Sequence, residues 1–154
     1  MHKIPYHKQE TNYTCGAACM RMALEALGIA KTEKQIANLL KTNKVSGTRT
    51  PQFPRVAEKF KLDYRIERNN TTIRQLKKAH KNGFVIILNY MLPTQGEHYA
   101  VLSKIGREYI YLHDPWVGPD TKYPIRTFLK IWRGAGPGKR GSDNEKFWFF
   151  GIKK

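Results

Sequence analysis

Cys15 follows a polar run and begins a stretch of residues that favour a helix, up to Gly28. The stretch is rich in Ala, Met and Leu, and Thr14, directly before the cysteine, is a suitable N-cap. Gly28 suits the left-handed position that ends many helices. We therefore expect a helix over 15–27 with Cys15 at its first turn. The free amides and the helix dipole stabilise a thiolate there, which makes Cys15 a candidate nucleophile.

A cysteine nucleophile needs a histidine with which to exchange its proton, and the chain has five histidines. His98 follows a loop that contains Gly96 and opens a predicted strand, and strand ends beside loops commonly carry functional groups. We therefore expect His98 to be the general base. His113 is the alternative base, but a position inside a predicted strand is more typical of a packed or exposed strand residue.

Asp114 is the candidate for the group that orients this histidine. The segments 98–105 and 108–114 are both predicted strands, and a tight turn containing glycine separates them. If they pair as a hairpin, His98 and Asp114 lie near the same end of it. The sequence therefore predicts a hydrogen bond between the two side chains.

The tetrahedral intermediate of acyl transfer needs hydrogen-bond donors for its oxyanion. The backbone N–H of Cys15 at the start of the helix is one candidate donor. The side-chain amide of Gln9, six residues earlier, is the second. Glu10 is excluded because an ionised carboxylate cannot donate.

Other sequence patterns predict the elements that must position these groups. Capping boxes at Thr32–Gln35 and Thr72–Gln75 open two helices, and a third helix follows Pro51. A continuous apolar run at 84–90 is typical of a central strand. The other expected elements are an edge strand at 62–66, strands at 98–105, 108–114 and 147–152, a short helix around Phe128, Leu129 and Trp132, and a Gly-rich loop at 134–145.

Most of the predicted helices precede most of the predicted strands. This order predicts an α+β fold with an N-terminal helical layer packed on a C-terminal antiparallel sheet. A length of 154 residues suits a single domain over 1–154, and no internal repeat or linker divides the chain.

The order of these motifs resembles the bacteriocin-processing (double-glycine leader) cysteine peptidases and their wider papain-like relatives. The matching residues are Gln9, then Cys15-Gly16 at the start of the Ala- and Met-rich helix, then His98-Tyr99-Ala100-Val101-Leu102, then Asp114-Pro115-Trp116. The resemblance implies a papain-like fold with Cys15 as nucleophile, His98 as base and acid, and Asp114 as orienting group. It also implies that Gln9 lies in the oxyanion hole, that no cofactor is required, and that cleavage follows a small-residue pair such as Gly-Gly in a leader peptide.

The chain departs from the family pattern in two ways. Thr14 stands where the family often has Asp. In transporters of the bacteriocin type the peptidase is fused to a membrane-spanning exporter, whereas no apolar run here approaches the roughly 20 residues that a membrane span needs.

The first fourteen residues lack the apolar core of a signal peptide, so we expect a cytoplasmic protein.

The formal net charge of +16 indicates either a solubilising basic surface or an anionic partner. An acidic peptide or protein substrate, nucleic acid and an anionic membrane surface are the candidate partners. The sequence contains no zinc-finger spacing and no aromatic-rich RNA-recognition strand to accompany the charge.

Three alternatives to a peptidase remain at the level of sequence. A deamidase, an acyltransferase or a transpeptidase would use the same residues on the same scaffold. A catalytically idle module would instead use the basic surface to bind nucleic acid or a membrane. A zinc site made of Cys15, Cys19, His98 and His113 is a weaker alternative, because the spacing matches no compact zinc pattern. Cys19 is more simply a small buried hydrophobic residue.

Overall fold

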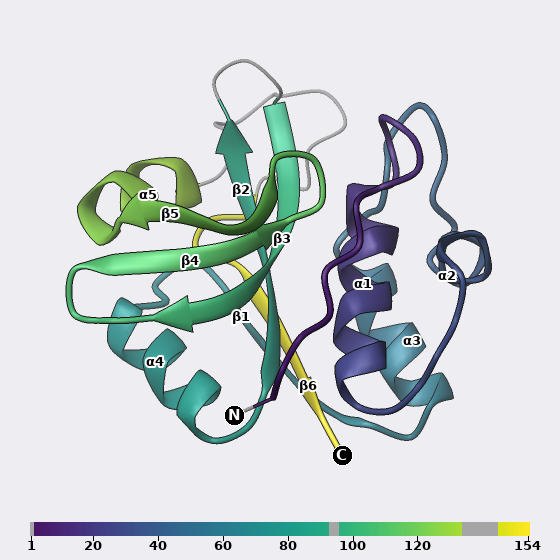
Figure 1. Ribbon diagram of the computed structural model, residues 1–154, viewed down its shortest axis with the longest axis horizontal. Coiled ribbons are helices and arrows are strands. Elements are labelled where there is room, and N and C mark those ends of the chain that lie inside the picture. The colour runs from purple at the N-terminus through teal and green to yellow at the C-terminus, as the bar shows by residue number, and fades with distance from the viewer. Residues whose placement is uncertain (1, 93–95, 134–144) are drawn as a thin grey trace.

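The computed structural model describes residues 2–92, 96–133 and 145–154 of the chain, and Figure 1 shows their arrangement. The helices are α1 (Cys15–Ala26), α2 (Glu33–Leu39), α3 (Gln52–Lys59), α4 (Ile73–Lys81) and α5 (Ile125–Trp132). The strands are β1 (Asp63–Glu67), β2 (Val85–Leu92), β3 (Gly96–Ile105), β4 (Tyr109–Asp114), β5 (Gly118–Pro124) and β6 (Phe149–Lys153). The strands form one antiparallel sheet in the order β1-β6-β2-β3-β4-β5. No helix in the described ranges is long and apolar enough to cross a membrane.

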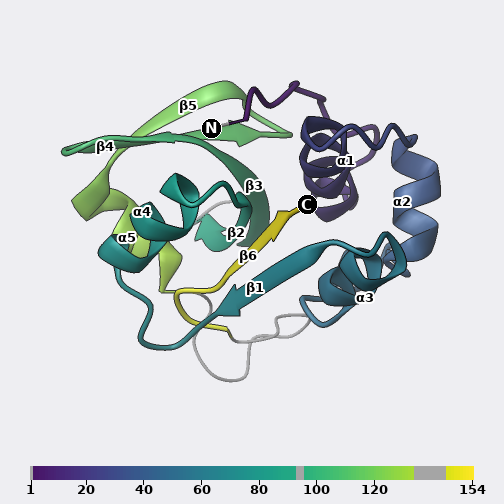
Figure 2. The same ribbon diagram turned by 90° about the horizontal axis from the view of Figure 1, so that it is seen from below.

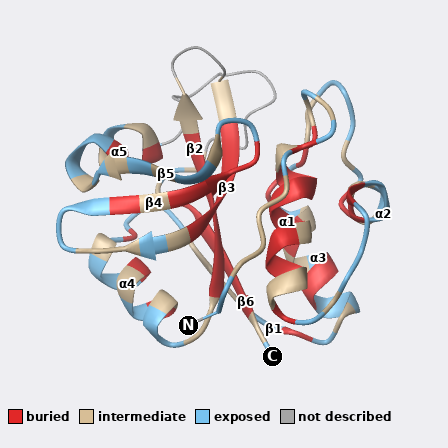
Figure 3. Cartoon of the chain, viewed as in Figure 1, coloured by how far each residue is buried: buried red, intermediate tan, exposed pale blue. Residues whose placement is uncertain are grey.

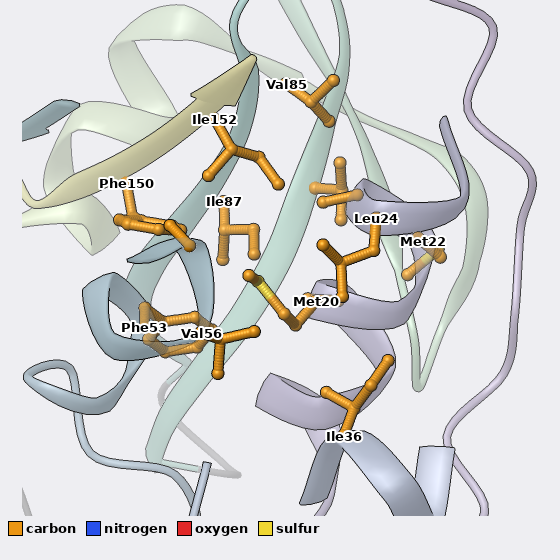
Figure 4. Close-up of a cluster of buried hydrophobic side chains, with 14 of the residues drawn as sticks. Met20, Met22, Leu24, Ile36, Phe53, Val56, Val85, Ile87, Phe150 and Ile152 are labelled. Atoms are coloured by element: carbon orange, nitrogen blue, oxygen red, sulfur yellow. The ribbon is translucent and has the colours of Figure 1, made fainter. Parts of the chain in front are cut away.

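Helices cover both faces of the sheet, with α1, α2 and α3 on one side and α4 and α5 on the other (Figure 2). On the first face, Met20 and Leu24 of α1 pack toward Ile87 and Ile152 of the sheet (Figure 4). The predicted α+β class, with a helical layer on an antiparallel sheet, is confirmed. The helices on the second face explain why β2 is a continuous apolar run, since its alternate residues are buried in two separate cores (Figure 3).

Most of the predicted capping signals at the helix ends are present in the structure. Both capping boxes, at Thr32–Gln35 and Thr72–Gln75, are formed. Gly28 ends α1 with a φ of +86°, and its N–H donates to the carbonyl of Glu25. Thr14 differs from the prediction: it occupies the N-cap position, but its hydroxyl bonds to Thr11 instead of capping the helix.

Two features of the sheet were not predicted from the sequence. The β5 strand was not predicted, because its polar sequence begins and ends near prolines, which sheets tolerate at an edge such as this one. The last strand, β6, lies between β1 and β2, a position that the sequence pattern did not specify. The Gly-rich loop expected at 134–145 falls almost entirely outside the described residues.

Gly16, directly after Cys15, is a position where only glycine fits. A Cβ there would lie 2.6 Å from both Cβ and Oγ1 of Thr48, which packs over the start of α1. We expect Gly16→Ala to lower the free energy of unfolding by about 1–3 kcal/mol, although alanine favours helix more than glycine does. Chemical denaturation measures this change.

The Thr48→Gly background is the control for this prediction, because it removes the side chain that causes the overlap. In that background Gly16→Ala should be neutral or stabilising. An equal loss of stability in both backgrounds would show that contact with Thr48 is not the cause.

Candidate active site

The N-terminal segment, residues 2–9, brings the two halves of the site together. It runs between α1 and the sheet (Figure 1), and three hydrogen bonds attach it to the end of β4 and the residue that follows. These bonds are from Gln9 N–H to the Pro115 carbonyl (2.9 Å), from the Tyr6 hydroxyl to the Asp114 carbonyl (2.7 Å) and from His113 Nε2 to the Ile4 carbonyl (3.0 Å). The segment therefore fixes the position of the loop that leads into α1 relative to the β3–β4 hairpin.

His98 and Asp114 meet at one end of this hairpin. His98 Nε2 lies 2.8 Å from Asp114 Oδ1, and both side chains are buried. The same oxygen accepts the backbone N–H groups of Trp116 (2.8 Å) and Val117 (3.0 Å), and Oδ2 accepts the Tyr90 hydroxyl at 3.0 Å. These donors hold the carboxylate in one orientation, so the predicted hydrogen bond between His98 and Asp114 is present and well supported.

The electrostatic surroundings of His98 and Asp114 favour an imidazolium and a carboxylate. Burial by itself lowers the pKa of His98, but the hydrogen bond to Asp114 and the interactions with Cys15 outweigh it and raise the pKa to about 9. Burial likewise raises the pKa of Asp114, but the hydrogen bond and charge of His98 and two backbone N–H groups lower it below its ordinary value. His98 is therefore an imidazolium at neutral pH. Since Nε2 is bound to Asp114, Nδ1 is the ring nitrogen left for the thiol.

A cavity of about 250 Å³ lies beside this pair. It is lined by Gln9, Asn12, Cys15, Glu97, His98 and Trp116. The thiol of Cys15 is partly exposed, whereas Cys19, one turn further along α1, is fully buried, and this burial raises its pKa well above the ordinary value. Cys15 therefore forms part of the cavity wall, and Cys19 belongs to the core, as predicted for a small buried residue.

Gln9 is held in place at the edge of this cavity. The residue is only 7% exposed, and its Nε2 donates one hydrogen to the carbonyl of Thr11 at 2.7 Å. Because an NH₂ group has two hydrogens, the second hydrogen of the amide is left to donate to a bound ligand. The fixed orientation suits a group that must donate to a bound ligand.

The structure supports neither His113 as the alternative base nor the alternative zinc site. His113 donates from Nε2 to the Ile4 carbonyl and accepts from the Asp120 N–H at Nδ1 (3.2 Å), so both ring nitrogens are used in hydrogen bonds within the fold. Within the described part of the chain, no three His, Cys, Asp or Glu side chains are placed to hold a metal ion.

Glu33 is a residue of the site region that no sequence pattern singled out. It lies on α2 with 2% of its surface exposed, and its carboxylate accepts the backbone N–H of Glu10 through both oxygens (3.2 and 3.0 Å). It also interacts with the hydroxyl of Thr14. Glu33 therefore supports the loop between Gln9 and Cys15 from behind. In the sequence it appears only as an unremarkable position inside a capping box.

We expect Glu33→Ala to lower the free energy of unfolding by about 1–3 kcal/mol, because it leaves the buried N–H of Glu10 without an acceptor. Glu33→Gln keeps one oxygen acceptor and should recover most of this loss. Denaturant unfolding of both variants measures the difference, and equal losses would contradict the role of the acceptor.

The same carboxylate should also affect the pH dependence of stability. Burial, the largest influence, raises the pKa of Glu33 above its ordinary 4.5. Its contribution to stability is therefore full below pH 4.5 and falls as the pH rises through the higher folded-state pKa. Glu33→Gln should remove this fall, which unfolding curves across mildly acidic pH would detect.

The comparison with known proteins agrees with the geometry of the site. The peptidase C39 family model matches residues 3–135. The fold is similar to the peptidase domain of Streptococcus ComA, a bifunctional ABC transporter involved in quorum sensing, with 16% identity, TM-score 0.76 and coverage of 97% of this chain and 98% of that chain. It is also similar to a double glycine motif protease from an AMS/PCAT transporter, solved with the leader peptide, with 19% identity, TM-score 0.69 and coverage of 99% and 94%.

A C39-like protein from Bacillus anthracis has 16% identity and TM-score 0.73, with coverage of 99% of this chain and 95% of that chain. No curated protein matches the chain. At these identities the solved structures establish the papain-like fold, and the family follows from the match over most of the sequence. The chain belongs to the peptidase C39 family, in agreement with its resemblance to the bacteriocin-processing cysteine peptidases.

Proposed function

We propose that this protein is a cysteine peptidase that uses Cys15 as nucleophile, His98 as base and acid, Asp114 to orient His98, and Gln9 in the oxyanion hole. The observation that carries the proposal is the shared cavity: Gln9, Cys15 and His98 all line it, and His98 is hydrogen-bonded to Asp114 behind it. Membership of a peptidase family supports the same chemistry.

The geometry supports a two-step acyl transfer. The thiolate of Cys15 attacks the carbonyl carbon of the scissile peptide bond, and the carbonyl oxygen becomes an oxyanion. The backbone N–H of Cys15, which has no acceptor within α1 because it lies in the first turn, and the second hydrogen of the Gln9 amide donate to this oxyanion. The imidazolium of His98 gives its proton to the leaving amine as the C–N bond breaks.

The second step releases the acyl group from sulfur. His98, now neutral, takes a proton from water, and the hydroxide oxygen attacks the thioester carbon. The C–S bond then breaks, which restores the Cys15 thiolate and the His98 imidazolium. Asp114 keeps the ring oriented and stabilises its positive charge in both steps.

The proposed substrate is a leader peptide or protein cleaved after a small-residue pair such as Gly-Gly. Two observations support this substrate: the motif resemblance, and the likeness to a double glycine motif protease solved with its leader peptide. The cavity beside Cys15 is also small, at about 250 Å³, with Trp116 as part of its wall.

A set of matched synthetic peptides tests the proposal. The peptides share one leader-like sequence and carry Gly-Gly, Ala-Ala or Val-Val at the cleavage position, and products are identified by mass spectrometry. We expect cleavage after Gly-Gly, weaker cleavage after Ala-Ala and none after Val-Val. Deamidation or acyl transfer without cleavage would overturn the peptidase assignment, and cleavage of all three peptides at equal rates would overturn the specificity.

Gln9→Ala tests the oxyanion hole in the same assay. Removing one oxyanion donor lowers kcat by about 10² to 10³, so we expect a loss of this size with little change in KM. Gln9→Glu should lose as much, because its carboxylate cannot donate. Asn12→Ala removes an exposed amide from the same cavity and is the matched control. Equal losses of kcat in the Gln9 and Asn12 variants would contradict the assigned role of Gln9.

A further inference from the structure

Tyr90 on β2 is a buried tyrosine whose hydroxyl the proposed mechanism does not use. It pairs in register with His98 on β3, and paired residues of an antiparallel sheet lie on the same face. The hydroxyl extends across β3 to the end of β4, where it donates to Oδ2 of Asp114 at 3.0 Å. Three neighbouring strands thus contribute one group each to a single hydrogen-bonded row: Tyr90, Asp114 and His98.

The ring of Tyr90 is fixed by its neighbours on two elements. It is fully buried, contacts the His98 ring edge-on with the centroids 5.6 Å apart, and contacts Phe128 of α5 with the centroids 5.7 Å apart. The hydroxyl therefore meets the carboxylate in one orientation. A phenylalanine at this position keeps both ring contacts, so the effect of the hydroxyl can be measured separately from that of packing.

The two oxygens of the Asp114 carboxylate have different partners. Oδ1 accepts His98 Nε2 and the backbone N–H groups of Trp116 and Val117, whereas Oδ2 accepts the Tyr90 hydroxyl. A hydrogen bond to a carboxylate stabilises its negative charge, so less of that charge acts on other neighbours. Tyr90 therefore limits how strongly Asp114 stabilises the imidazolium of His98.

The Tyr90 hydroxyl keeps its proton while His98 titrates. Burial and the charge of Asp114 raise the pKa of Tyr90 well above its ordinary value of 10.0, so the phenol remains a donor. The other titratable groups near His98 and Asp114 are Cys15 and Cys19 of α1, Tyr6 of the N-terminal segment, Glu97 of β3 and Tyr123 of β5. These groups are the same in the wild type and in a Tyr90 variant, so a difference between the two reports on the hydroxyl.

We propose that Tyr90 is a positioning residue for the reaction: its hydroxyl fixes the Asp114 carboxylate and takes up part of its charge, so that His98 can give its proton to the leaving amine. This inference rests on the proposed peptidase function. An imidazolium that Asp114 stabilises too strongly is a weak acid, and a weak acid transfers its proton slowly. Tyr90 acts on the proton donor through Asp114 and is itself buried away from the substrate.

NMR titration of the His98 ring and profiles of kcat/KM against pH test the proposal in Tyr90→Phe. Burial lowers the pKa of His98, and the hydrogen bond to Asp114 raises it. Without the Tyr90 hydroxyl the influence of Asp114 grows, so the His98 titration and the alkaline limb should both move up by about half a pH unit. This direction is opposite to the one expected for Asp114→Asn. The value of kcat should fall roughly threefold to tenfold with little change in KM. A titration that stays in place or moves down would overturn the role of Tyr90.

Tyr6→Phe is the matched control, because the Tyr6 hydroxyl donates to the backbone carbonyl of the same Asp114 at 2.7 Å and not to its carboxylate. This variant should leave the His98 titration where it is in the wild type. An equal upward move in both variants would overturn the proposal, since it would assign the effect to a general loosening around Asp114. In an Asp114→Asn background Tyr90→Phe should no longer raise the titration, because an amide has no charge to share, and a shift of the same size there would contradict the proposal.

3-Fluorotyrosine at position 90 varies the donor with little change in packing, so it keeps the test available if Tyr90→Phe does not fold. Its more acidic hydroxyl should donate more strongly and move the His98 titration down, and an upward move would overturn the proposal. The NMR titration separates this inference from the proposed function. The expected shifts in a protein that cleaves no peptide would overturn the peptidase, whereas absent shifts in a protein that cleaves the Gly-Gly peptide would overturn the role of Tyr90 alone.

Discussion

Replacing Cys15 by alanine should abolish peptide cleavage and leave the fold intact. The thiolate is the only group in the proposed mechanism that forms a bond to the substrate, so no residual covalent pathway remains after its removal. Cys15 lies at the helix start and is partly exposed, and alanine favours helix, so little stability should be lost. The measurement is kcat/KM on the Gly-Gly peptide, together with an unfolding curve for each variant.

Cys19→Ala is the control for this experiment, because it removes the other cysteine of the same helix. Cys19 is fully buried, so the substitution should lower the free energy of unfolding by about 1–2 kcal/mol through lost packing. Cleavage should persist in this variant. Cleavage that survives in Cys15→Ala would exclude a thiol mechanism at this position. Absence of cleavage in the wild type as well as in Cys15→Ala would make the idle basic module the leading alternative.

His98→Gln should lower kcat by about 10² to 10⁴, the range expected for the loss of a positioned proton donor. Asp114→Asn should give a different signature, namely a shift of the pH profile. In the wild type His98 has a pKa of about 9, so activity that needs the imidazolium should fall on an alkaline limb near that pH. Burial lowers the pKa of His98 and remains without the carboxylate, while the hydrogen bond and the charge of Asp114, which raise this pKa, are lost, so the limb should move to lower pH.

The stability of the protein should follow the same titration. The folded-state pKa of His98 is raised from 6.5, so its contribution to stability is full below pH 6.5 and is lost as the pH rises through about 9. Asp114→Asn should remove this loss. Profiles of kcat/KM against pH measure the shift of the alkaline limb, NMR titration of the His98 ring measures its pKa, and unfolding curves between pH 6.5 and about 9 measure the loss of stability.

His113→Gln is the matched control for these experiments, since His113 is the neighbour of Asp114 on β4. It should destabilise the fold, because its ring nitrogens bond to Ile4 and Asp120. The alkaline limb should stay where it is in the wild type. A limb that moves in His113→Gln and not in Asp114→Asn would reassign the base to His113.

Much of the candidate site could be predicted because its signals are short-range. The helix that begins at Cys15 follows from the helix-forming residues after it and from Gly28, which ends it. The hairpin of β3 and β4 follows from two short strand patterns and the tight turn between them, and it alone brings His98 near Asp114. In each case the forces act between residues close in sequence, which is the information that periodicity and capping patterns carry.

The remaining features depend on contacts between distant parts of the chain. The last strand enters the sheet between β1 and β2, and β5 forms only because β4 offers it an edge to pair with. Tyr90 reads in the sequence as one more residue of an apolar run, yet its hydroxyl supports Asp114. Such partners are selected by packing between whole elements, and no local pattern specifies which elements will meet.

The sequence by itself determined which residues can do chemistry here: a cysteine at a helix start, a histidine at a strand start and an aspartate at the end of the next strand. The tertiary structure alone decided how residues 2–9 would attach to β4, that Glu33 would support the loop after Gln9, and that Tyr90 would hold Asp114. The physical reason is that residues 2–9 bond to β4 and its end across more than 100 positions, as from His113 to Ile4 (a separation of 109). Contacts over such separations arise from the packed fold and leave no periodic trace in the sequence.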